Sequence, residues 1–166
     1  MATDKIWLTR HGERVDHVDA KWRSRHSSCS KDDPPLSDRG RTQAVEVGER
    51  LKTENIRHIF SSPFQRCVET AHIIAEKLGG LSCFPRVSKT VLAIRKRYPS
   101  DTLLFVGHGA SVAGMLHGFT NGKETNYYVG YCTLCYLERK NGETYWESKF
   151  VGNPDHLSDK SNLRAY

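Results

Sequence analysis

Short apolar runs alternate with amphipathic stretches along most of the chain. Three runs end in turns rich in polar residues or glycine and predict buried strands, at Lys5–Thr9, Arg57–Ser61 and Thr102–Gly107. Elsewhere apolar residues recur at spacings of three and four, as on the buried face of a helix. The helices predicted in this way are Asp38–Leu51, Pro63–Leu78, Arg86–Tyr98 and Ala110–Phe119.

Capping signals indicate where two of these helices begin. Ser37 is the predicted N-cap of the first helix. Ser62 is the predicted N-cap of the second, with Pro63 at the first helical position and Gln65 at the capping-box position. This places Arg66 in the first turn, where free backbone N–H groups also attract an anion. The predicted buried stripe of the second helix is Cys67, Val68, Ala71, Ile74, Ala75 and Leu78.

The remaining segments complete the predicted architecture. Val15–Pro35 lacks apolar periodicity, and a long polar loop near a functional site is expected there. A short strand is predicted at Leu81–Phe84, and Tyr131–Glu138 and Thr144–Val151 flank an Asn-Gly pair and predict a hairpin. Strands that alternate with helices predict a three-layer α/β/α sandwich with a mostly parallel sheet and the hairpin at or near one edge.

Length and composition indicate a single domain, residues 1–166, with an anionic ligand. A chain of 166 residues and 18.9 kDa can bury a substantial core. The formal net charge of +6 and the isoelectric point near 9.1 favour an anionic partner. No apolar run approaches the roughly 20 residues of a membrane span, so no membrane role is expected. Five irregularly spaced cysteines are typical of reduced thiols and a cytoplasmic protein.

Two further patterns are interpreted as structural. The basic helix Arg86–Arg97 lacks interleaved aromatic residues, so it predicts a solvated face rather than nucleic-acid binding. Cys132 and Cys135 form a lone CxxC pair, which is a weak zinc signal without a second pair, and ordinary packing is the favoured interpretation. No metal and no cofactor are therefore expected.

Basic side chains follow all three predicted strands. The first strand leads into Arg10, His11 and Arg14, the second into Arg66, and the third into His108. Ligands of open α/β sheets bind beyond the carboxyl ends of the strands. Arginine meets phosphate oxygens in bidentate fashion, and a neutral imidazole can attack phosphorus. The surrounding cations are expected to lower the pKa of His11 by like-charge repulsion.

Four stretches in this order resemble the histidine phosphatase, or phosphoglycerate-mutase-like, superfamily: Leu-Thr-Arg-His-Gly-Glu-Arg, Pro-Pro-Leu-Ser-Asp-Arg-Gly, Ser-Ser-Pro-Phe-Gln-Arg and Val-Gly-His-Gly-Ala-Ser. The first is most similar to the phosphatase domain of the suppressor-of-T-cell-receptor-signalling proteins. The resemblance implies a phosphoglycerate-mutase-like fold and hydrolysis of a phosphorylated small molecule or phosphoprotein. It also implies His11 as the nucleophile, with Arg10, Arg14, Arg66 and His108 on the phosphate and Ser62 in the substrate site.

The chain departs from this family after the second helix. The family's phosphatase branch carries a general-acid carboxylate there, often in an insertion that covers the site, whereas residues 77–100 contain no Asp or Glu. The domain thus resembles a shortened variant that lacks much of this insertion. Glu13 is a candidate replacement acid, although a salt bridge to Arg10 and Arg14 is the favoured interpretation. Weak activity, biased toward aryl phosphates or phosphohistidine, is expected.

Three hypotheses therefore follow from the sequence. The first is a metal-independent phosphomonoesterase or phosphoramidase that forms a phosphohistidine on His11. The second is a catalytically weak phosphate-binding or scaffolding protein that has lost its general acid. The third is a metal-dependent hydrolase with His11 and His108 as ligands. The sequence predicts neither the physiological substrate nor the oligomeric state.

Overall fold

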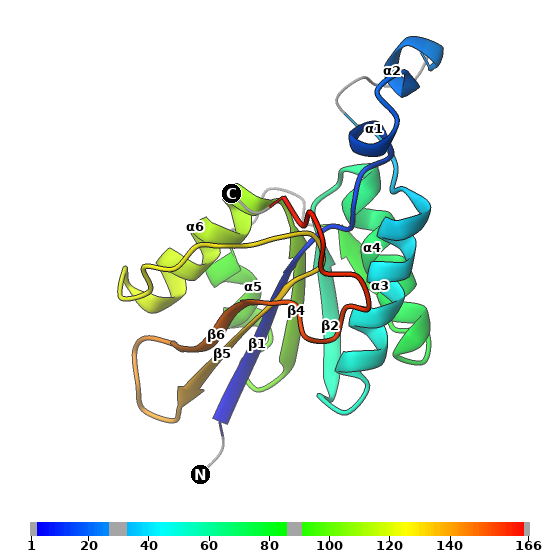
Figure 1. The fold of residues 1–166 in the computed structure, drawn as a ribbon. Helices are drawn as coiled ribbons and strands as arrows, with labels where there is room; N and C mark the ends of the chain where they lie inside the picture. The colour runs from blue at the N-terminus through cyan, green and yellow to red at the C-terminus, as the bar shows by residue number, and fades with distance from the viewer. Residues whose placement is uncertain (1–2, 27–32, 86–90, 165–166) are drawn as a thin grey trace.

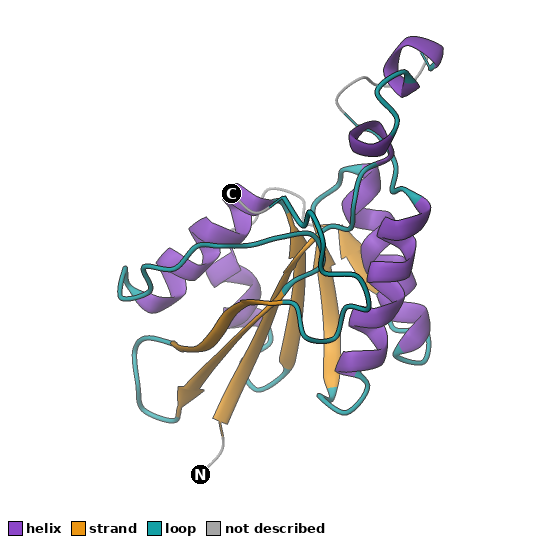
Figure 2. Ribbon diagram, viewed as in Figure 1, coloured by secondary structure: helices purple, strands orange, loops and turns teal. Residues whose placement is uncertain are grey.

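A six-stranded sheet forms the centre of the molecule (Figures 1 and 2). The computed structural model describes residues 3–26, 33–85 and 91–164. The strand order is β3-β2-β4-β1-β5-β6. The strands are β1 (Thr3–Arg10), β2 (Ile56–Ser61), β3 (Cys83–Pro85), β4 (Thr102–Gly107), β5 (Leu134–Lys140) and β6 (Glu147–Asn153).

Helices cover both faces of the sheet. The helices are α1 (Val15–Val18), α2 (Trp22–Arg25), α3 (Asp38–Leu51), α4 (Gln65–Lys77), α5 (Val91–Arg97) and α6 (Gly109–Thr120). Figure 2 shows α3 and α4 on one face, α5 and α6 on the other, and the short α1 and α2 beyond the ends of the strands. The predicted three-layer α/β/α sandwich is confirmed.

Strands β1 to β4 are parallel, and the hairpin β5–β6 joins the sheet antiparallel to β1. β6 forms the edge of the sheet, as predicted for the hairpin. The register aligns Arg10 of β1 with Gly107 of β4, and Ser61 of β2 with Val106 of β4. The carboxyl ends of these three strands therefore lie side by side, and so do the residues that follow them.

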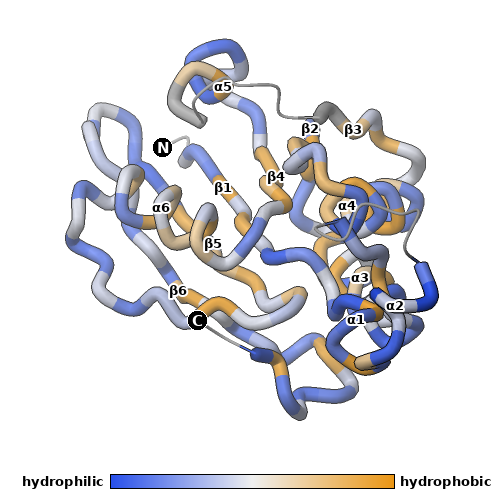
Figure 3. The backbone as a smooth tube through the Cα atoms, turned by 90° about the horizontal axis from the view of Figure 1, so that it is seen from above, coloured by the Kyte–Doolittle hydropathy of each residue, from blue (hydrophilic) through white to orange (hydrophobic). Residues whose placement is uncertain are grey.

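Two apolar clusters separate the layers. Residues of α3 and α4, among them Val47 and Ile74, pack with Trp7 on one face of the sheet. Residues of α6, among them Leu116, pack with Ile6 and Leu8 on the other. Successive strand residues point to opposite faces, which explains this division of β1. Figure 3 shows the hydrophobic positions gathered along the strands and α4, and hydrophilic ones around them.

Several predicted boundaries need correction. Helix α4 begins at Gln65 with Phe64 as its N-cap, so the prediction of Ser62 as N-cap was wrong. Ser62 instead continues β2, since its N–H donates to the carbonyl of Val106 at 3.0 Å. Val68 was placed in the buried stripe but is 40% exposed. Strand β5 begins at Leu134 rather than Tyr131, and Ser37 is confirmed as the N-cap of α3.

The two polar segments also differ in part from expectation. The loop expected at Val15–Pro35 contains the short helices α1 and α2, and its residues 27–32 lie outside the described part. The same holds for residues 86–90 of the predicted third helix, including Val87. Arg95 of α5 is buried rather than solvated. It donates hydrogen bonds to the carbonyls of Tyr98 and Asp101 at 2.9 and 2.7 Å, and so connects α5 to the start of β4.

Within the described ranges, no helix combines the length and the apolar character that crossing a bilayer requires.

Candidate functional site

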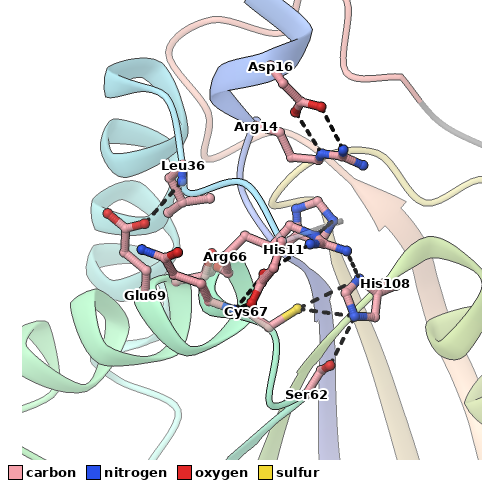
Figure 4. A network of polar contacts seen from close by, with 12 residues as sticks. His11, Arg14, Asp16, Leu36, Ser62, Arg66, Cys67, Glu69 and His108 are labelled. Carbon is pink, nitrogen blue, oxygen red and sulfur yellow. Dashed lines mark hydrogen bonds and ion pairs between the residues drawn. The ribbon is translucent and has the colours of Figure 1, made fainter. Parts of the chain in front are cut away.

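The basic side chains predicted from three separate motifs meet at the carboxyl end of the sheet (Figure 4). His11 continues β1, and its N–H donates to the carbonyl of Gly107 at 2.9 Å. His108 follows β4 directly and is the N-cap of α6. Arg66 is the second residue of α4, which follows β2. The parallel sheet therefore brings Arg66 to both histidines, although it lies 55 positions after His11 and 42 before His108.

Two glycines allow the loop after β1 to lie against the start of α3. A Cβ on Gly12 would lie 2.5 Å from the carbonyl oxygen of Gly40, and a Cβ on Gly40 would lie 2.3 Å from that of Glu13. Cβ atoms do not approach backbone oxygens so closely. Glycine at both positions is therefore needed to hold His11 in place, which explains one glycine in each of the first two motifs.

The ring of His11 has a defined orientation and tautomer. Nδ1 lies 2.7 Å from the carbonyl oxygen of Gly12, which can only accept a hydrogen bond, so Nδ1 carries the proton. Nε2 therefore presents a lone pair, and it accepts a hydrogen bond from Nε of Arg66 at 3.3 Å. This arrangement gives His11 an oriented nucleophilic nitrogen at the floor of the cluster.

His11 is uncharged at neutral pH. Its pKa is lowered to about 2; burial is the largest cause, and the charges of Arg10 and Arg66 and the His108 ring act in the same direction. The expected direction is thus confirmed, but the expected cause was wrong in its order, because loss of hydration outweighs like-charge repulsion. Only 3% of the residue is exposed, so water cannot stabilise an imidazolium there.

The guanidinium of Arg66 contacts three other side chains of the site. Its Nε donates to His11, its Nη2 lies 3.4 Å from Nδ1 of His108, and its Nη1 lies 3.3 Å from Oδ1 of Asp33. The guanidinium also lies 4.7 Å from the ring centre of Phe64. A planar fork held on several sides is suited to meet two phosphate oxygens at once.

His108 is a second neutral imidazole, opposite His11. The two ring centres are 5.4 Å apart. Because a guanidinium has only donors, Nδ1 of His108 accepts from Arg66, and the proton on Nε2 is donated to Oγ of Ser62 at 2.9 Å. Burial, followed by the charges of Arg66 and Arg10, lowers the pKa of His108 to about 4. Ser62 therefore lies beside His108 and orients its ring.

Arg10 is a buried cation near the two imidazoles. Its guanidinium lies 4.4 Å from the ring centre of Tyr131, and its Nη1 donates to the carbonyls of Val129, at 3.3 Å, and Arg164. Only 3% of Arg10 is exposed, and its charge lowers the pKa of both His11 and His108. The segments around Tyr131 and Arg164 thus hold this cation close to both imidazoles.

Arg14 has an acidic partner of its own. Its Nε and Nη2 donate to the two carboxylate oxygens of Asp16 at 3.0 and 2.8 Å, above the His11–His108 pair in Figure 4. Its positive charge lowers the pKa of His108, so it lies within electrostatic range of the site. For Arg14 to bind phosphate, its guanidinium must either leave Asp16 or contact Asp16 and the phosphate at the same time.

Both carboxylate oxygens of Glu13 have partners outside the cluster of His11, Arg66 and His108. Its Oε2 accepts from Nη1 of Arg39 at 2.8 Å, and its Oε1 accepts from Oγ of Ser37 at 2.8 Å. The expected salt bridge to Arg10 and Arg14 was wrong, because the first turn of α3 supplies both partners. With each oxygen bound and 3% of the residue exposed, the geometry favours a structural role over the candidate acid role.

Sequence reasoning missed two residues of the site. Asp33 contacts Arg66 and lies at the N-terminus of α4. The phenol oxygen of Tyr131 is hydrogen-bonded to Nδ1 of His17, and the Tyr131 ring lies beside Arg10 and His11. An aspartate directly before a Pro-Pro-Leu motif was the available signal for Asp33. Tyr131 carries no local signal, since only the tertiary fold brings it to β1.

No metal centre is formed by the residues that the structure describes. In residues 3–26, 33–85 and 91–164, no three His, Cys, Asp or Glu side chains are grouped to hold an ion. Cys132 and Cys135 are both buried, and the pKa of each thiol is raised by burial. Their packing among apolar residues agrees with the structural interpretation of the CxxC pair.

Comparison with known proteins finds relatives for part of the sequence. Residues 6–85 match the model of the histidine phosphatase superfamily (branch 1). The chain is 33% identical over 100 residues to the probable phosphoglycerate mutase GpmB of Cronobacter sakazakii, covering 60% of this chain and 44% of that protein. It is 37% identical over 75 residues to GpmB of Salmonella choleraesuis, covering 45% and 32%. The match thus spans less than half the length of these curated relatives.

Solved structures share the fold at low sequence identity. YhfR of Bacillus stearothermophilus has a TM-score of 0.71 at 20% identity, with 93% of this chain and 99% of that chain covered. A phosphoserine phosphatase from Entamoeba histolytica has a TM-score of 0.72 at 18% identity, with the same coverage. A phosphoglycerate mutase from Bacillus anthracis has a TM-score of 0.67 at 14% identity, with 94% and 96% covered. The chain thus has the phosphoglycerate-mutase-like fold, and its residues 6–85, which carry the first three motifs, match the histidine phosphatase superfamily.

Proposed function

We propose that this protein hydrolyses phosphomonoesters or phosphoramidates through a phosphohistidine intermediate on Nε2 of His11. The observation that carries the proposal is the tautomer of His11, whose Nδ1 proton is held by the Gly12 carbonyl while Nε2 faces Arg66. A neutral, oriented imidazole is competent to attack phosphorus without prior deprotonation. The surrounding cations would stabilise the negative charge of the transferring group.

The positions of the side chains suggest how the phosphoryl group is held. Substrate oxygens replace His11 as acceptor on the Nε–Nη2 side of Arg66, which frees the lone pair of His11 for attack. The N–H at Nε2 of His108 donates to a phosphate oxygen in place of Ser62. Arg10 supplies further positive charge near both imidazoles. These groups perform positioning and electrostatic stabilisation, which are the main requirements of phosphoryl transfer. The proposed reaction therefore needs no metal ion.

A low rate, with a preference for good leaving groups, is part of the proposal. Residues 77–100 contain no carboxylate, and we interpret residues 1–166 as one domain in which the insertion carrying the family's acid is reduced. General acid catalysis typically contributes about 10²–10⁴-fold, and its weakening harms alkyl esters most. A phenol, with a pKa near ~10, departs as phenoxide with less help.

The substrate class is inferred from the site and its relatives. Two structurally similar proteins are described as a phosphoserine phosphatase and a glucosyl-3-phosphoglycerate phosphatase, whose names denote phosphorylated substrates. The cationic floor formed by Arg10 and Arg66 suits a phosphate group on a small molecule or on a phosphoprotein. These two arginines recognise the phosphate group, and residues at the rim of the site would contact the rest of the substrate.

The test combines turnover with capture of the intermediate. The protein and its His11→Ala variant are assayed on aryl phosphate, alkyl phosphate and phosphoramidate, with chelator present and absent. We expect chelator-insensitive turnover, an acid-labile phosphorylated protein after rapid quenching, and loss of both in a folded His11→Ala variant. Unimpaired turnover by that variant would refute the assignment. Loss of activity in chelator would instead favour a metal-dependent hydrolase.

A second candidate is a phosphate-binding or scaffolding protein without significant turnover. The missing carboxylate in residues 77–100 favours it, because the anion-binding side chains remain while the usual proton donor does not. Titration calorimetry with inorganic phosphate, together with the assay above, separates the two. Binding that Arg66→Ala abolishes, with no detectable turnover on any substrate class, would support this candidate.

A further inference from the structure

The carboxylate of Asp33 lies directly beside the central arginine of the site. Its Oδ1 is 3.3 Å from Nη1 of Arg66, and its two oxygens accept from the backbone N–H of Gln65 at 2.8 and 2.9 Å. Its negative charge also opposes the lowering of the pKa of His108. About a quarter of the side chain, 27%, is exposed. Asp33 is thus a partly solvated carboxylate that contacts Arg66 and lies within electrostatic range of His108.

Asp33 lies on the side of Arg66 where the leaving group of a bound substrate would be. His11 binds Nε of Arg66, whereas Asp33 binds Nη1 of the same planar group. His11 lies at the buried floor and Asp33 at the exposed rim. In phosphoryl transfer the attacking and leaving atoms are roughly in line, so a leaving oxygen points away from His11 and toward the rim.

We propose that Asp33 is the general acid and base of this site, acting in place of the carboxylate that residues 77–100 lack. The inference rests on the proposed function, because it assigns a proton donor to the same reaction. It goes beyond that function by making turnover of alkyl phosphates depend on a loop residue that precedes α3.

The proposed steps balance in protons and electrons. In the first step Nε2 of His11 bonds to phosphorus, the bond from phosphorus to the leaving oxygen breaks with its electron pair on oxygen, and the carboxyl proton of Asp33 moves to that oxygen. In the second step the Asp33 carboxylate takes a proton from water as the water oxygen bonds to phosphorus. The phosphorus–nitrogen bond then breaks, which returns neutral His11, inorganic phosphate and protonated Asp33.

Substrate binding provides the reason for Asp33 to carry a proton. Without substrate, the Asp33 carboxylate contacts Arg66 and accepts a hydrogen bond from the Gln65 amide. A bound phosphomonoester competes for Arg66 and places a second anion beside Asp33, and repulsion between two anions favours uptake of one proton. The ester can supply that proton itself, because its second ionisation lies near pH ~6.

Asp33 also has a structural task that the test must separate from catalysis. The N-cap residue Phe64 makes no side-chain capping bond, so Asp33 caps α4 from a neighbouring loop. Asparagine caps helices about as well as aspartate but cannot donate a carboxyl proton. Asp33→Asn therefore keeps the capping acceptor and removes the acid. Asp33→Glu keeps a carboxyl group at a slightly different position.

The experiment measures kcat/KM across a series of aryl and alkyl phosphate monoesters graded by leaving-group pKa. It compares the wild type, Asp33→Asn, Asp33→Glu and the control Asp38→Asn, whose fully exposed carboxylate pairs with Arg41 in the first turn of α3. We expect Asp33→Asn to lose about 10²–10³-fold on alkyl phosphate and a much smaller factor on nitrophenyl phosphate. We expect Asp33→Glu to recover part of the alkyl rate and Asp38→Asn to follow the wild type.

Each other outcome overturns the inference in a recognisable way. Equal losses on alkyl and aryl esters would mean that Asp33 only positions Arg66. A gain in affinity for inorganic phosphate without a change in leaving-group dependence would mean that the carboxylate only competes with substrate. An unchanged series would leave Asp33 as a helix cap. Absence of His11-dependent turnover in the wild type would refute the proposed function itself, and the inference with it, whereas the other outcomes refute Asp33 alone.

Discussion

At the scale of single residues, burial determines the chemistry of the site more than charge does. His11 and His108 lie next to two arginines, yet loss of hydration is the largest cause of the low pKa of each ring. An imidazole that stays neutral in this surrounding retains its lone pair over the physiological range. The same burial makes the folded state sensitive to acid, since the unfolded chain can protonate these rings and the folded chain cannot.

The unfolding free energy should therefore decrease as the pH is lowered, and part of this decrease should depend on His11. The pKa is near 6.5 in the unfolded chain and about 2 in the folded one, so below pH 6.5 only the unfolded state gains the proton. The unfolding free energy should drop by roughly 2 kcal/mol between pH 7 and pH 5 on this account. Urea denaturation at both pH values measures it, and His11→Gln should show a correspondingly smaller drop. Equal pH dependence in both proteins would contradict the shifted pKa.

Arg66 should not be replaceable by lysine. Three of its nitrogens contact His11, His108 and Asp33, and a single ammonium cannot reproduce this fork. We expect Arg66→Lys to lower kcat by about 10²–10³-fold, as for loss of one oriented transition-state donor. Steady-state kinetics on nitrophenyl phosphate measures it. Arg50→Lys, at an exposed pair with Glu54, serves as the matched control and should stay within a few-fold of wild type.

At the scale of elements, the site depends on the contact between the loop after β1 and the start of α3. The Gly12–Gly40 approach and the Ser37 and Arg39 bonds to Glu13 hold that loop from one side. Thr70 of α4 holds it from the other side, because its Oγ1 accepts from the Gly12 N–H at 3.1 Å. The backbone that carries His11 is thus fixed by two helices.

Alanine at Gly40 should damage both stability and activity. The added Cβ would lie 2.3 Å from the Glu13 carbonyl oxygen, so the loop or α3 must move. We expect a loss of roughly 1–3 kcal/mol in unfolding free energy, as for overpacking in a tight core, together with reduced kcat. Gly114→Ala in α6 is the control, with no atom within 4 Å of the new Cβ. It should stabilise the protein by about 0.5–1 kcal/mol. Equal thermal and chemical stability of the two variants would contradict the close contact.

At the scale of the whole molecule, the last described residues complete the site from outside the α/β core. Figure 1 shows the C-terminal segment returning to the carboxyl ends of the strands. Leu157 and Leu163 pack in the cluster shared with α3 and α4, and the carbonyl of Leu163 accepts from the Tyr131 N–H at 2.9 Å. Because the next residue, Arg164, supplies an acceptor for Arg10, this segment links core packing to a buried cation of the candidate site.

Leu163→Ala should therefore affect stability and catalysis together. Removing this buried side chain should lower the unfolding free energy by about 2–5 kcal/mol, and loosening of Arg10 should lower kcat on nitrophenyl phosphate. Val18→Ala, at a side chain that is 60% exposed, should change the unfolding free energy by less than about 0.5 kcal/mol. Urea denaturation and kinetics on the same preparations test both. A destabilised Leu163→Ala with wild-type kcat would separate the segment from the site.

The sequence by itself determined the architecture and the three basic residues that meet at the carboxyl end of the sheet. Strand and helix periods are local properties, and parallel strands joined by helical crossovers necessarily bring their carboxyl ends to one edge. His11, Arg66 and His108 each follow such a strand, so their meeting could be predicted from three separate motifs. The order of the motifs also indicated the family whose model matches residues 6–85.

Only the tertiary structure decided which partner each polar side chain takes and how deeply it is buried. Glu13 pairs with Arg39, and Arg10 faces Tyr131, because these contacts depend on packing between segments far apart in the chain. Asp33 caps α4 from a loop that precedes α3. The capping side chain is therefore remote in sequence from the helix, whereas the local pattern predicted Ser62. The low pKa of His11 also follows from burial, which is a property of the assembled layers and not of the residues adjacent in sequence.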